Sequence, residues 1–172
     1  MKLSSINNSV SFCATINENT RNIIKRYDRH CPEKFEEKFD KAIKESPLKD
    51  FGGNETTISV GVYSNSNSWG ETSRIPAPVI NTTINGKEIS ATLPGYGHDI
   101  EIEDEDDIIR HLQLKKYAQF DFFHILNNVN LDKIKTLLAQ EYIKQSAQEM
   151  IENATSDTFD KINSGEIKFP NI

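Results

Sequence analysis

The pair Asn85-Gly86 constrains the fold more than any other feature, because it lies between two segments of alternating polar and apolar residues. Asn-Gly readily takes the two positive φ angles of a type I′ turn, which joins antiparallel strands through a two-residue loop. Such a loop pairs Ile84 with Lys87 and places six side chains on one face: Ile80, Thr82, Ile84, Ile89, Ala91 and Leu93. Because the pairing and the hydrophobic pattern agree, we predict a β-hairpin with Ile80, Ile84, Ile89 and Leu93 buried.

The same period of two residues predicts further strands. Polar and apolar residues alternate in an N-terminal segment, 9–16, and in 56–63, and we expect both to be strands. The hairpin adds the strands 78–84 and 87–93. Ile100 and Ile102 allow a short fifth strand over 99–103. The polar segment 64–74 contains Trp69 and is expected to form a loop, with Trp69 either folded back on it or exposed as an anchor for a partner.

Apolar residues three and four positions apart predict helices on both sides of the strands. Two helices start near Asn17 and Pro32, one runs from about Asp104 to Asn127, and another starts near Leu131. In the third helix we expect burial of Ile108, Ile109, Leu112, Phe120, Phe123 and Leu126. In the fourth we expect one buried stripe made of Ile134, Leu138, Ala147, Met150, Ile151 and Ala154, with a last turn near Phe159 and Ile162.

Strands in the middle of the chain and helices at both ends are typical of the α+β class. We therefore expect a mostly antiparallel sheet of three to five strands packed against four or five helices. A chain of 172 residues fits a single domain, so we expect residues 1–172 to form one, and 1–8 and 166–172 are the segments that can stay outside it as tails.

Hydrophobic segments are short, and none approaches the roughly 20 apolar residues of a membrane span. We expect a soluble protein in the cytoplasm, with secretion without a signal peptide as the alternative. The excess of lysine over arginine and the abundance of Asn and Ile indicate an AT-rich genome, and we expect a bacterial source. Cys13 and Cys31 are expected to be reduced thiols.

Seven acidic residues lie between Asp99 and Asp107, and they account for more than the whole net charge of −6. This charge predicts no nucleic-acid partner. One interpretation is structural, because carboxylates in the first turn of a helix are stabilised by its dipole and Asp104 can cap it. The other is a binding site in which Asp99, Glu101, Glu103 and Asp104 hold Ca²⁺ or Mg²⁺ or contact a basic protein.

A second candidate is His98 beside Asp99, in a Gly-x-Gly loop that could carry a general base. No phosphate-binding loop, nucleophile elbow or zinc-ligand spacing is present. We therefore expect a small protein-interaction module without evident catalytic machinery and without a cofactor. It would contact its partner through the sheet edge, the Trp69 loop or the acidic segment. The alternative is a small hydrolase-like or metal-assisted enzyme that uses His98 and the acids from Asp99 to Asp107.

Overall fold

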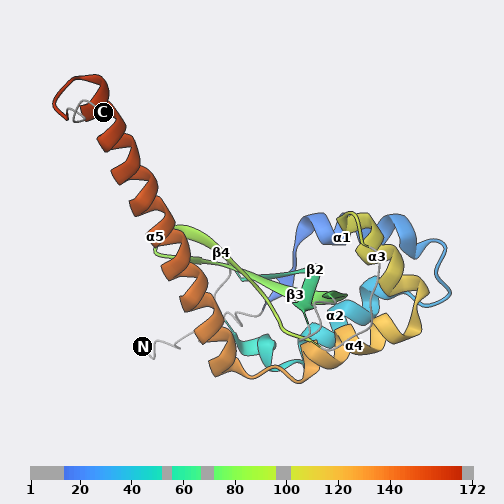
Figure 1. Ribbon diagram of the computed structural model, residues 1–172. Helices are drawn as coiled ribbons and strands as arrows, with labels where there is room; N and C mark the ends of the chain where they lie inside the picture. Colours follow the sequence, from blue (N-terminus) through green and yellow to red (C-terminus); the bar gives the residue numbers. More distant parts are fainter. Residues whose placement is uncertain (1–13, 52–55, 67–71, 96–101, 168–172) are drawn as a thin grey trace, which may run out of the picture.

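The computed structural model describes residues 14–51, 56–66, 72–95 and 102–167, and within them the chain has the α+β fold expected (Figure 1). One mixed, mostly antiparallel sheet has the strand order β1-β2-β3-β4. The elements in chain order are β1 (Thr15–Ile16), α1 (Glu18–Asp28), α2 (Phe35–Glu45), the 3-10 helix η1 (Pro47–Asp50), β2 (Thr57–Ser66), β3 (Thr72–Ile84), β4 (Lys87–Thr92), α3 (Glu105–Leu114), α4 (Lys116–Asn127) and α5 (Leu131–Asn163).

The predicted hairpin is confirmed in its turn and its register. Asn85 has φ 52° and Gly86 has φ 80°, and β3 pairs with β4 so that Ile84 lies opposite Lys87. Ile80, Ile89 and Leu93 are buried as predicted. Ile84 is only half-buried, because it precedes the turn and borders a groove at the end of the sheet rather than the core.

The middle strands are longer than predicted. β2 continues to Ser66 and β3 begins at Thr72, so most of the expected loop 64–74 is strand, and Trp69 lies outside the described residues. Pro76 precedes the predicted strand 78–84 and argues against extending it, since proline cannot donate to a neighbouring strand. Both Pro76 and Pro78 are accommodated because β4 ends at Thr92, opposite Val79, which leaves the earlier part of β3 in register with β2 alone.

The outer segments of the predicted sheet are described only in part. Thr15 and Ile16 form β1, which pairs in parallel with Thr57 and Ile58 of β2, and the rest of the predicted strand 9–16 contains residues outside the described set. Of the short fifth strand expected over 99–103, only Ile102 and Glu103 are described, and neither is in a strand.

Helices α2 and α4 enclose an aromatic core. The ring centroids of Phe39 and Phe122 are 5.2 Å apart, and those of Phe35 and Phe123 are 5.6 Å apart. Phe35, Phe39 and Phe122 are fully buried. Aromatic pairs in such arrangements add about 0.5–1.5 kcal/mol each to the stabilisation that comes from burial itself.

The prediction of one helix over 104–127 is wrong at Lys115. Lys115 is extended, with φ −110° and ψ 107°, and its N–H donates to the carbonyl of His111 at 2.8 Å, so α3 ends there and α4 begins. Because of the break, the side chains of α4 point in directions different from those they would have in one continuous helix. As a result Phe122 is buried and Phe120, which we expected to be buried, is 65% exposed.

Helix α5 extends well beyond the sheet and the other helices (Figure 1). Its first turns pack into the core through Ile134 and Leu138, which are buried. Every residue from Gln148 to Lys161 is exposed. Among the described residues, no helix combines the length and the apolar character needed to cross a membrane.

Candidate functional site

The described part of the acidic segment is occupied in holding α3 in place. Asp104 caps the helix by accepting the Asp107 N–H at 2.8 Å. The Glu105 carboxylate accepts from Asn19 at 2.7 Å and from the Thr20 hydroxyl at 3.0 Å, which fixes α3 to α1. These contacts match the structural interpretation, since each acid in the first turn is stabilised by the dipole and by a partner.

The other two acids of that turn have arginine partners. Asp106 pairs with Arg26 at 2.8 Å, and Asp107 pairs with Arg110. The Glu103 N–H donates to Asp107 at 3.3 Å. In the described ranges no three side chains of His, Cys, Asp or Glu gather as a metal ion requires. His98, Asp99 and Glu101 lie outside those ranges, so the cation-site hypothesis stays a prediction.

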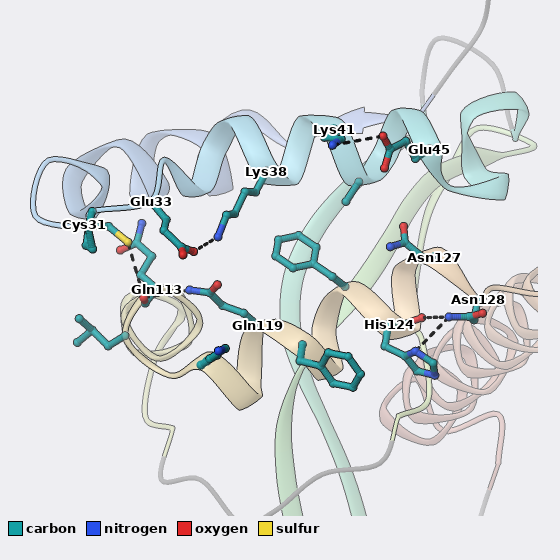
Figure 2. A pocket seen from close by; sticks show the side chains of 16 residues that line it. Cys31, Glu33, Lys38, Lys41, Glu45, Gln113, Gln119, His124, Asn127 and Asn128 are labelled. Atoms are coloured by element: carbon teal, nitrogen blue, oxygen red, sulfur yellow. Dashed lines mark hydrogen bonds and ion pairs between the residues drawn. The ribbon is translucent and has the colours of Figure 1, made fainter.

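A groove of about 720 Å³ opens between α2 and α4 (Figure 2). Cys31, Gln113 and Gln119 lie at one end, and His124 and Asn128 lie at the other. Two ion pairs lie on its rim, where Lys38 contacts Glu33 and Lys41 lies 3.7 Å from Glu45. The exposed ring of Phe120 stacks on His124, with the two ring centroids 5.7 Å apart.

The groove does not bring together a nucleophile and a base. The Cys31 thiol donates to the Gln113 carbonyl at 3.7 Å, and burial, together with the charge of Asp28, raises its pKa, so the unreactive thiol form is favoured. His124 contacts Asn128, whose side-chain nitrogen lies 3.2 Å from its Nδ1. A catalytic imidazole is usually oriented by a carboxylate, and the structure shows no carboxylate bonded to this one in its described part.

The exposed half of α5, residues 148–163, carries large apolar side chains on its surface. Met150 is 67% exposed, Ile151 63% and Phe159 60%. Six residues line a shallow hollow of about 340 Å³ along this half: Ile151, Ala154, Thr155, Thr158, Phe159 and Ile162. We call these six residues the distal stripe. Isolated apolar residues are common on surfaces, whereas these residues lie together in one row along the helix.

The two threonines of the distal stripe behave as apolar residues. The Thr155 hydroxyl donates to the Ile151 carbonyl and the Thr158 hydroxyl to the Ala154 carbonyl, both at 2.7 Å. Because their hydroxyls are satisfied within the helix, no desolvation penalty for an unpaired donor arises when a partner covers them. Together with Ala154, the two threonines are small side chains that lie between the larger Ile151 and Phe159.

The distal stripe lies on the opposite side of α5 from the face that contacts the hairpin. Tyr142 and Ser146 contact the hairpin side chains of Asn85 and Lys87, at 3.4 and 3.1 Å. Ile151 follows Tyr142 by nine residues, which is about two and a half turns at 3.6 residues per turn. The distal stripe therefore cannot pack on the body of the protein while the helix is straight.

This arrangement corrects the prediction of a single buried stripe on α5. Ala154 follows Leu138 by sixteen residues, which leaves the two side chains about 160° apart around the helix. Ile134 and Leu138 are buried, whereas Met150, Ile151 and Ala154 are exposed. The sequence contained this information in the phase of the apolar residues, which belong to two faces rather than one.

Comparison with known protein families, with curated proteins and with solved structures found no match to this chain.

Proposed function

We propose that this chain is a protein-interaction module that binds a helical segment of another protein along the distal stripe. The observation that carries the proposal is the position of that stripe. It combines three large apolar side chains with Ala154 and two threonines on the part of α5 that extends beyond the sheet and the other helices, and it faces away from the hairpin-contacting side. A groove along an apolar helix face is the common receptor for a second amphipathic helix.

The helix itself supports this assignment. Sixteen residues of isolated helix are marginally stable in water, because most helical stability in proteins comes from packing of an amphipathic face. A partner that covers the distal stripe would supply that packing. The distal stripe replaces the Trp69 loop and the acidic segment as the proposed contact, since Trp69 lies outside the described residues and Asp104, Glu105 and Asp106 are engaged with α3 and α1.

Site-specific photo-crosslinking tests this function. A photoreactive amino acid replaces Thr155 on the distal stripe or, as the matched control, Asn153 on the opposite exposed face of the same turn. In extract of the source cells, we expect a discrete crosslinked product from position 155 that disappears when Ile151→Glu is added. The same products from both positions, or none from position 155, would contradict the proposal.

A further inference from the structure

The main chain turns back toward α5 just beyond the distal stripe. Gly165 has φ 78°, and its N–H donates to the Ile162 carbonyl at 3.1 Å, which ends the helix. The Ile167 N–H then donates to the Lys161 carbonyl at 3.0 Å. Lys161 follows Ala154 of the distal stripe by seven residues, so the two lie within about 20° of each other around the helix. The chain therefore leaves the turn on the side of α5 that carries the distal stripe.

The segment that follows the turn matches the distal stripe in length. Ile151 and Ile162, the two ends of the stripe, are eleven residues apart, which is about 16 Å at 1.5 Å per residue. Residues 168–172, which follow the described part of the chain, span about 16 Å when extended. Pro170 favours an extended backbone at its own position and at the position before it. A segment that ran back along α5 from Ile167 would therefore reach the far end of the stripe.

Residues 168–172 also contain apolar side chains at a suitable spacing. Phe169 and Ile172 are three residues apart. In the polyproline II conformation, which has three residues per turn, they share a side and stand about 9 Å from each other. That distance corresponds to about six residues of α5, so both side chains fit within the length of the hollow from Ile151 to Ile162.

Resting on the proposed function, we infer that residues 168–172 fold back along the distal stripe and that the partner helix must displace them. Attachment to the end of α5 keeps this segment at an effective concentration in the millimolar range, far above that of a free partner. Burial of Phe169 and Ile172 favours the closed arrangement, and the entropy lost in ordering the segment opposes it. If the stripe is covered in about 70–90% of molecules, removing the cover should raise the affinity for the partner about three- to tenfold.

Photo-crosslinking in the purified full chain tests the contact without any partner. A photoreactive amino acid replaces Thr155 or, on the opposite face, Asn153, and mass spectrometry maps the products. We expect position 155, and not position 153, to crosslink to residues 168–172 of the same molecule, with a yield that does not change on dilution. Phe169→Asp should abolish this product, whereas Asn171→Asp adds the same charge, keeps both apolar side chains and should retain it.

The same variants measure competition in extract of the source cells. With the photoreactive group at position 155 and the chain at low concentration, Phe169→Asp should raise the yield of the partner product about three- to tenfold. Asn171→Asp should leave that yield at the wild-type value. Melting temperatures equal to that of the wild type would show that both variants keep the fold.

Absence of the intramolecular product from position 155 would overturn the inference. A product whose yield rises with protein concentration in place of it would do the same, because such a product joins two copies of the chain. An unchanged partner yield in Phe169→Asp would also overturn it, since the segment would then not compete. If no variant gives a partner product in extract while the intramolecular product forms, the proposed function is rejected and the contact between residues 168–172 and the distal stripe stands.

Discussion

Phe120 and Phe122 lie two residues apart on α4 and should differ sharply when each is replaced by alanine. Phe122 is fully buried, with its ring 5.2 Å from that of Phe39 and 5.6 Å from that of Phe123. Truncation of a buried phenylalanine costs about 3–5 kcal/mol, from lost burial and from the cavity left behind. Phe120 is 65% exposed and stacks on the exposed ring of His124, so its truncation should cost about 0.5 kcal/mol.

Urea unfolding followed by far-ultraviolet circular dichroism measures this difference. At about 2–4 °C per kcal/mol for a chain of this size, Phe122→Ala should also melt at least about 6 °C below wild type, and Phe120→Ala within about 2 °C of it. Phe122→Leu serves as the control that keeps most of the volume, and it should recover much of the loss. Equal losses for the two alanine variants, or a larger loss for Phe120→Ala, would refute the helix break at Lys115 and the phase that follows from it.

Three further predictions concern α3 and its surroundings. Asp104→Ala should destabilise the protein by about 0.5–2 kcal/mol through loss of the cap, and Asp104→Asn should retain most of that stability in the same urea titration. Burial lowers the pKa of His111, so the unfolded state takes up a proton first. Stability should therefore be lost as the pH falls below about 6.5, the unfolded value, and His111→Gln should remove that part of the loss between pH 7.5 and 5.5. Millimolar Ca²⁺ should raise the melting temperature no more than NaCl of equal ionic strength, because Glu105, Asp106 and Asp107 already have partners. A larger Ca²⁺ shift that Glu101→Gln with Glu103→Gln abolishes would instead support the cation site.

The hairpin could be predicted in detail because its determinants are local. Asn85-Gly86 sets the turn, the turn sets the register, and the register agrees with the alternation of Ile80, Ile89 and Leu93. The start of β3 could not be predicted, since Pro76 argues against a strand unless one knows that β4 ends opposite Val79. Where β4 ends along β3 depends on how the strands pair in the folded sheet, and no local sequence pattern contains that information.

The helix break at Lys115 was missed for a related reason. The sequence from Asp104 to Asn127 contains no proline or glycine, so nothing local ends a helix there. The break lets α3 pack against α1 while α4 turns to place Phe122 beside Phe39. Tertiary packing therefore overrides helix propensity at this residue, as it commonly does for a single residue of modest preference.

The acidic segment shows that a cluster of charges in a sequence does not say which of its carboxylates have partners in the fold. Seven acids in nine residues suggest a cation or a basic partner, yet the four from Asp104 to Asp107 cap α3, bind α1 and pair with Arg26 and Arg110. The four acids of residues 148–163 have fewer partners, since Glu149 pairs with Lys87 and Glu152 accepts from Gln148, and no ion pair of Asp157 or Asp160 occurs within the described part of the chain. What distinguishes the two groups is the number of partners per carboxylate, which a count of charges along the chain does not contain.

The length of α5 also supports the proposed function. A helix that only completed the core could end soon after Tyr142 and Ser146, where its contacts with the hairpin side chains lie. It continues to Asn163, and over that distance its apolar residues move to the opposite side. A polar surface all around would be the expected composition of a helix that meets only water. The apolar row from Ile151 to Ile162 is therefore better explained by a surface that meets another chain than by the stability of this one.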